Sequence, residues 1–185
     1  MVDITPQTLT IYLVMFLSLQ SVAAIENDIV DSTSEYRLDT GDKIRIQVYD
    51  EEDLNLEARV DDGGIISYPF LGNLKVIGIT PGQLEDLITA RLKGDYLVNP
   101  KVSVDIIEYR QFYVNGEVVK PGGFPFQPGI TVRKAISVAG GFKERASKEK
   151  IFIIRDESPD AKPFKVQLDE IIRPGDIITV EESFF

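Results

Sequence analysis

Apolar and polar positions alternate strictly along residues 43–49, where Ile44, Ile46 and Val48 share one side and Arg45 and Gln47 the other. A period of two is typical of a half-buried strand. Similar alternation or short apolar runs predict further strands at residues 65–68, 74–76 and 101–107. The first hundred residues therefore contain the strands of a small sheet.

The clearest helix signal lies between these strands. Thr80 can cap the helix, Pro81 suits its first position, and Gln83 completes a capping-box pattern. The apolar stripe that follows consists of Leu84, Leu87, Ile88 and Leu92. We expect the helix to end at Gly94. The pattern predicts an amphipathic helix that packs on the sheet.

A second series of elements begins near residues 108–111. It opens with a predicted strand at 112–114, a tight hairpin turn at Asn115-Gly116 and a return strand at 117–119. Thr131 then caps a short helix, closed by Gly140-Gly141, whose apolar face carries Val132, Ala135, Ile136 and Ala139. The last predicted strands are residues 151–154, 164–168 and 177–180. We expect an α+β fold made of two small mixed sheet-plus-helix units.

The amino terminus has the form of an export signal. Residues 11–19 read IYLVMFLSL and are followed by small residues ending at Ala24, which predicts a signal peptide at 1–24 with cleavage after Ala24. The apolar stretch 11–25 is shorter than the ~20 residues of a spanning helix. Because the first ten residues carry Asp3 and no lysine or arginine, an uncleaved anchor, a misassigned start and a buried helix stay open. Residues 25–35 are interpreted as a flexible leader.

Composition removes whole classes of chemistry. The 185 residues include no cysteine and no histidine, so disulfides, thiol nucleophiles, Cys/His zinc sites and imidazole catalysis are excluded. A formal net charge of -10 disfavours nucleic acid as a partner. We predict no catalytic residue, metal ligand or cofactor, and we interpret the acidic run 50–53 as a solvated loop rather than a calcium site.

Aromatic residues gather in the second series of elements. They are Tyr109, Phe112, Tyr113, Phe124, Phe126 and Phe142, with basic residues close by in the sequence. Such rings either fill a small core or lie exposed, where they stack on sugars or bury at protein interfaces. The segments around Gly41-Asp42 and Gly175-Asp176 also echo each other, each a Gly-Asp turn that starts a strand. The requirements of this turn explain the similarity, so no internal duplication of the sequence is inferred.

Two long passages resemble a known family. Residues 36–107 carry YRLDTGDKIRIQVY, RVDDGGIISYPFLGNLKVIGITPGQLEDLITARL and NPKVSVDI, and are similar to the polysaccharide export domain of Wza-type export proteins. Residues 112–180 carry FYVNGEVVKPGGFPFQPGITVRKAISVAGGF and RPGDIITV, and resemble the soluble-ligand-binding β-grasp module (SLBB) that follows it. The resemblance implies an export domain at 36–108 and a β-grasp domain at 109–185.

The resemblance also implies a function. It predicts a periplasmic, non-enzymatic subunit of a capsule or exopolysaccharide export channel, forming homo-oligomeric rings around the polysaccharide. Implied partners are an inner-membrane co-polymerase and an outer-membrane pore protein, which would hold the chain near that membrane. Larger members carry a lipidated cysteine, further β-grasp repeats and a carboxy-terminal amphipathic helix, so we expect a short member that does not cross the outer membrane unaided.

One alternative function remains open from the sequence. It is a monomeric periplasmic module that binds glycan on its aromatic residues. The candidate glycan or subunit contacts are Tyr113, Arg133, Lys134 and Arg145.

Overall fold

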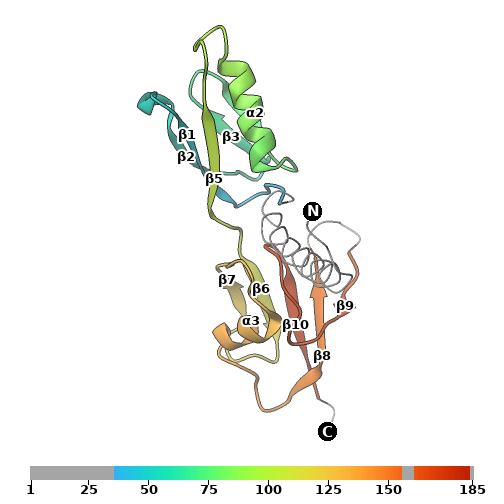
Figure 1. Ribbon diagram of the computed structural model, residues 1–185. Helices are drawn as coiled ribbons and strands as arrows, with labels where there is room; N and C mark the ends of the chain where they lie inside the picture. Colours follow the sequence, from blue (N-terminus) through green and yellow to red (C-terminus); the bar gives the residue numbers. More distant parts are fainter. Residues whose placement is uncertain (1–35, 156–160, 184–185) are drawn as a thin grey trace, which may run out of the picture. The chain divides into compact units, whose positions relative to one another are not determined.

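The computed structural model describes residues 36–155 and 161–183 (Figure 1). The predicted signal peptide 1–24, its cleavage site after Ala24 and the leader 25–35 lie outside the described residues.

Residues 36–108 build one three-stranded antiparallel sheet, one hairpin and one α-helix. The elements are β1 (Lys43–Val48), the short 3-10 helix η1 (Glu52–Leu54), β2 (Leu56–Arg59), β3 (Ile65–Tyr68), β4 (Gly72–Lys75), α2 (Pro81–Leu92) and β5 (Val102–Glu108). The sheet has the order β2-β1-β5, and β3 pairs with β4. In β1, Ile44, Ile46 and Val48 are buried, as the alternation predicts. The acidic run 50–53 leads into η1, whose Leu54 is buried.

Helix α2 begins and packs as the sequence predicts. The Thr80 hydroxyl accepts from the Gln83 N–H at 3.2 Å, and the Gln83 side chain accepts from the Thr80 N–H at 2.9 Å. The stripe residues other than Leu87 are fully buried. In the second turn of the helix, the Glu85 carboxylate accepts a hydrogen bond from the Val104 N–H at 2.8 Å. This bond satisfies a backbone donor of β5, which is one of the two edge strands of the sheet.

Residues 109–183 build a five-stranded mixed sheet and one helix (Figure 1). The elements are β6 (Phe112–Gly116), β7 (Gly122–Phe124), α3 (Val132–Val138), β8 (Ala146–Ile154), β9 (Phe164–Lys165) and β10 (Ile177–Glu182). The order is β7-β6-β10-β8-β9. Strands β6 and β10 run parallel, and the other neighbouring pairs of this sheet run antiparallel within the described residues. Together with the first sheet, this confirms the α+β class.

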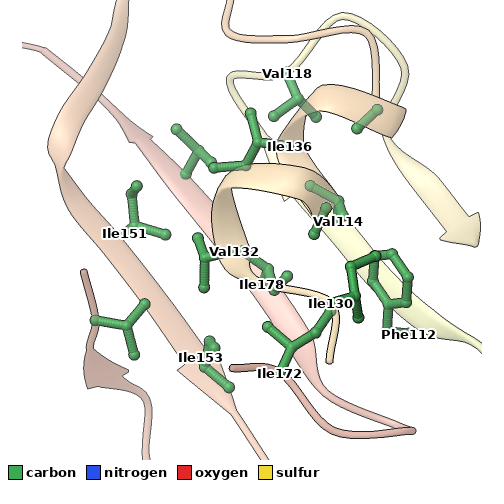
Figure 2. Packing of buried hydrophobic residues seen from close by; sticks show 14 residues of the cluster. Phe112, Val114, Val118, Ile130, Val132, Ile136, Ile151, Ile153, Ile172 and Ile178 are labelled. Atoms are coloured by element: carbon green, nitrogen blue, oxygen red, sulfur yellow. The ribbon is translucent and has the colours of Figure 1, made fainter. Parts of the chain in front are cut away.

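Helix α3 covers the apolar face of this sheet (Figure 2). Val132 and Ile136 point from the helix toward Ile151 and Ile178 on the strands. Phe112 is fully buried and stacks on Phe124 at 5.9 Å between ring centroids. The rings of Phe124, Phe126 and Phe142 are partly buried against the same core. Part of the aromatic cluster therefore belongs to the core, in line with the interpretation that these rings fill a small core.

The predicted hairpin turn at Asn115-Gly116 is wrong. Strand β6 continues through both residues, and β6 pairs with β7 rather than with a return strand at 117–119. The reason is the parallel partner: Thr179 and Val180 of β10 lie opposite Asn115 and Gly116. A Cβ on Gly116 would lie 2.1 Å from the Val180 carbonyl oxygen, so this glycine serves close strand approach.

Strand boundaries also differ from the predictions. Strand β2 was not predicted, and β8 begins at Ala146 rather than at residue 151. Strand β9 is two residues long instead of five. The early part of β8 is polar, so no apolar alternation marks it, yet Ala146 still pairs with Glu182 of β10. Pairing with a neighbouring strand defines these segments more than their own pattern does.

The two Gly-Asp turns have the same construction. Asp42 and Asp176 are the buried charged residues of the described chain, at 0% and 1% exposure. Each carboxylate accepts the N–H of the residue three positions earlier, at 2.9 Å from Asp39 and 2.8 Å from Arg173. Each turn passes through a glycine of positive φ, +91° and +86°. The echo in the sequence thus reflects one solution for starting a strand, used twice.

Candidate functional site

Arg110 joins the segment after β5 to the first Gly-Asp turn. Its backbone N–H donates to Asp42 Oδ1 at 2.7 Å. Its guanidinium nitrogens lie 3.4 Å from Asp39 Oδ2 and 3.7 Å from Asp42 Oδ2. The Arg110 Cβ is 3.5 Å from where a Cβ on Gly41 would stand, so the turn passes tightly against this arginine. The buried carboxylate of Asp42 is therefore compensated by N–H donors and a positive charge.

A hollow of about 740 Å³ surrounds this segment. Its size is in the usual range for sites that hold small molecules or short segments of a polymer. The lining residues combine aromatic rings with charged and amide side chains; they are Asp39, Thr40, Gly41, Arg59, Ile107, Glu108, Tyr109, Arg110, Gln111, Tyr113, Pro125, Phe126, Pro128 and Gly175. Arg59 hydrogen-bonds both the Gly41 carbonyl and the Glu108 carboxylate there.

The aromatic lining of the hollow consists of Tyr109, Tyr113 and Phe126. Tyr109 is half-buried and meets Phe126 edge-on, with ring centroids 5.4 Å apart. Burial raises the pKa of the Tyr109 hydroxyl, and the negative charge of Asp42 raises it further. The phenol therefore keeps its proton at neutral pH and can act as donor and acceptor. Tyr113, on β6, is 46% exposed and presents its ring to solvent.

The other sequence candidates do not line this hollow. Arg133 and Lys134 are exposed residues of α3, and Arg145 lies in the segment before β8. The Arg145 guanidinium pairs with Glu182 at 3.1 Å, with 79% of its side chain exposed. Lys134 lines a second, smaller hollow of about 250 Å³ together with Gln127, Pro128, Ile130, Ser137 and Val138. Of the four candidates, only Tyr113 joins the larger hollow.

The carboxylates of the larger hollow lie beside basic side chains. Asp39 and Asp42 face Arg110, and Glu108 faces Arg59. Within residues 36–155 and 161–183, no group of three or more acidic side chains is placed to hold a metal ion. In the same part of the chain, no helix combines the length and apolarity needed to cross a membrane. The arrangement suits binding through stacking and hydrogen bonds.

Sequence reasoning missed the acidic and basic partners of this hollow. Asp39 and Arg59 are remote in sequence from Tyr113, and only the fold of residues 36–108 brings them beside residue 110. The one available signal was the Asp-Thr-Gly-Asp turn, which was interpreted only as a strand start. A second omission is the exposed aromatic pair Phe70 and Tyr96, whose ring centroids lie 5.5 Å apart.

Two family models match consecutive parts of the chain. Residues 30–107 match the family of polysaccharide biosynthesis/export proteins. Residues 111–167 match the SLBB domain. The hollow around residues 107–111 therefore lies where one match ends and the other begins.

The curated relatives are named for the production, export or transport of polysaccharides. The exopolysaccharide production protein ExoF of Rhizobium meliloti (strain 1021) is 30% identical over 139 residues, covering 69% of this chain and 33% of that protein. The EPS I polysaccharide export outer membrane protein EpsA of Ralstonia solanacearum is 30% identical over 132 residues, covering 57% and 35%. The polysialic acid transport protein KpsD of Escherichia coli is 29% identical over 124 residues, covering 65% and 22%.

These matches span about a third or less of the length of those relatives. Along this chain, the export-domain match is followed directly by the SLBB match, in the order that the sequence motifs predict. The chain therefore carries the export domain of the polysaccharide biosynthesis/export family, followed by an SLBB domain.

Proposed function

We propose that this protein is a periplasmic, non-enzymatic subunit of a capsule or exopolysaccharide export channel. It assembles into a homo-oligomeric ring, which gives the polysaccharide a passage. An inner-membrane co-polymerase and an outer-membrane pore protein are its partners, and they hold it near the outer membrane. The observation that supports this proposal most is that one chain contains the export domain followed by an SLBB domain.

The side-chain chemistry supports a passive role. A conduit for a hydrophilic polymer must be wetted and must not trap its cargo, so binding should be weak and spread over many subunits. Arg110 and Arg59 engage the acidic side chains of the larger hollow, and no free acid–base pair is left there. Because a formal charge of -10 makes copies of the chain repel each other overall, the ring depends on local contacts between basic and acidic patches of neighbouring copies.

The test is a charge reversal at the proposed subunit contacts. Arg133→Glu, Lys134→Glu and Arg145→Glu are combined, and native mass and secreted polymer are measured in cells that lack the wild-type copy. We expect a smaller native mass and lost secretion, because an interface repeated around a ring fails everywhere at once. A matched control reverses Lys75, Lys93 and Lys165, which are exposed on other elements. Normal secretion by a protein that is monomeric alone and with its partner would overturn the ring.

The larger hollow favours a second candidate function, a glycan-binding module. Tyr113 offers an exposed ring, and Tyr109, Gln111 and Arg59 add hydrogen-bonding groups around it. If a monomer holds saccharide there, Tyr113→Ala should weaken retention on a polysaccharide affinity gel. Tyr49→Ala is the control, since Tyr49 is 70% exposed and does not line the hollow. Equal retention of the two variants would remove this candidate.

A further inference from the structure

Phe70 occupies a strained turn between β3 and β4. The Leu71 N–H donates to the Pro69 carbonyl at 2.7 Å, which closes a three-residue turn around Phe70. The φ of Phe70 is +61°. A turn of this kind with positive φ is a rare and strained form, and a bulky side chain adds to its cost. The hairpin therefore holds this phenylalanine against its backbone preference.

The fold does not use the ring that this turn presents. Phe70 is 68% exposed, whereas Tyr68 and Leu74 in the flanking strands are 2% and 1% exposed and form the hairpin's contact with the core. Among the described residues, Phe70 and Asp50 alone combine a side chain with positive φ. The strained backbone thus holds a ring that the core leaves exposed, which points to a role outside folding.

Tyr96 lies beside Phe70, and backbone hydrogen bonds fix the loop that carries it. Its backbone N–H donates to the Leu92 carbonyl at the end of α2, at 3.2 Å, and the Gly94 N–H donates to the Leu97 carbonyl at 2.8 Å. The Tyr96 ring is 49% exposed and is tilted by 42° against the ring of Phe70, 5.5 Å away. The Tyr96 hydroxyl reaches the Phe70 carbonyl in a long hydrogen bond of 3.4 Å. Two loops thus present one open aromatic pair.

We propose that Phe70 and Tyr96 form a stacking site for an uncharged sugar ring of a polysaccharide, an inference that rests on the proposed role in export. The C–H face of a pyranose packs on an aromatic face, and its hydroxyls can pair with the Tyr96 hydroxyl. Asp95 stands next to Tyr96 in the chain, and the protein carries a formal charge of -10. This charge repels anionic ligands, so the site favours neutral sugars over sialic or uronic acids.

The open geometry fits a polymer in transit. Aromatic contacts contribute only modestly each, and a pair with two partly exposed rings has no walls to retain its ligand. Such a site gives short-lived contacts that many copies of the chain can repeat. The strain at Phe70 and the exposure of both rings then have one explanation.

The experiment follows the two rings directly. The purified protein is labelled with fluorinated phenylalanine and tyrosine, and fluorine NMR records titrations with cellohexaose and maltohexaose as neutral probes and α2,8-linked oligosialic acid as an anionic probe. We expect concentration-dependent shifts at Phe70 and Tyr96 with at least one neutral probe and at least tenfold weaker effects with oligosialic acid. Tyr49→Ala, which removes an exposed ring that stacks under Lys101, should leave these shifts unchanged.

Phe70→Gly separates binding from folding. Glycine accepts a φ of +61°, so this variant should melt at the same or a higher temperature while the Tyr96 shift disappears. Tyr96→Ala should abolish the Phe70 shift. A lower melting temperature for Phe70→Gly would give Phe70 a structural role and overturn the proposal. Absent shifts with both neutral probes, or equal shifts with oligosialic acid, would overturn it as well.

Native mass distinguishes this site from the proposed channel. If Phe70→Gly reduces the native mass, the aromatic pair is a contact between copies and the sugar site is wrong. If the protein assembles but its rings show no shifts, the site fails while the channel stands. If the rings shift in a protein that is monomeric alone and with its partner, the channel fails while the site stands.

Discussion

Tyr68 shows how one buried polar atom links two elements. Its ring is 2% exposed at the end of β3, and its hydroxyl donates to the Leu54 carbonyl in η1 at 2.8 Å. Burial raises the pKa of this hydroxyl to about 12, from an ordinary value of 10.0. The hydrogen bond explains why a tyrosine rather than a phenylalanine stands in this part of the core.

Tyr68→Phe should destabilise the protein by about 1 kcal/mol at neutral pH, because the Leu54 carbonyl loses its donor. Above pH 10 the unfolded chain loses the tyrosine proton while the folded protein retains it up to about pH 12. The wild type therefore loses stability over this window and the variant does not, so the difference between them should shrink. Denaturant unfolding at pH 7 and pH 11 measures it. A difference that stays constant with pH would contradict the assignment.

Single residues also show how far the sequence predicted the candidate site. An exposed Tyr113 was within reach, because in the predicted strand at 112–114 its side chain points to the face opposite Phe112 and Val114, which are buried. The carboxylate of Asp42 was not, because nothing in a local pattern says that Arg110 returns to it across 68 positions. Contacts between segments far apart in sequence depend on the tertiary fold, which local periodicity does not encode.

At the scale of elements, the parallel pairing of β6 with β10 depends on Gly116. We expect Gly116→Ala to destabilise the protein by about 2–4 kcal/mol, because the new Cβ would stand 2.1 Å from the Val180 carbonyl at a φ of +83°. Gly94→Ala is the control, with a φ of +94° and no atom within 4 Å of its Cβ. It should cost only about 1 kcal/mol. Equal losses in chemical denaturation would show that the strands move apart freely.

The contact between α3 and its sheet makes a second prediction at this scale. Ala139 is fully buried at the end of the helix, so Ala139→Leu should overpack the core and cost about 1–3 kcal/mol. The neighbouring Val138 is 52% exposed, and Val138→Leu should change the melting temperature little. An unchanged melting temperature for Ala139→Leu would contradict the tight contact.

Elements with local signals were predicted well, and those defined by pairing were not. The capping box of Thr80 and Gln83 acts within four residues, so α2 was predicted from its first turn onward. Asn115-Gly116 carries an equally clear hairpin signal, yet it became part of β6. The burial gained by pairing β6 with β10 outweighs a local turn preference, which contributes little by itself.

For the whole molecule, the amino-terminal segment predicts the compartment. The apolar segment 11–19 and the small residues up to Ala24 predict export and cleavage. Amino-terminal sequencing of the protein from a periplasmic fraction should begin at Ile25. Recovery from membranes of a chain that still begins at Met1 would favour the uncleaved anchor instead.

The bond from the Val104 N–H to the Glu85 carboxylate has a consequence for assembly. A free strand edge can recruit the edge of another chain into one continuous sheet, which is how many proteins aggregate. In β5 the Val104 N–H is already bonded to a side chain of α2, so an incoming strand would lack this donor for its ladder of hydrogen bonds. The edge of β5 is therefore a poor template for adding a strand from another chain.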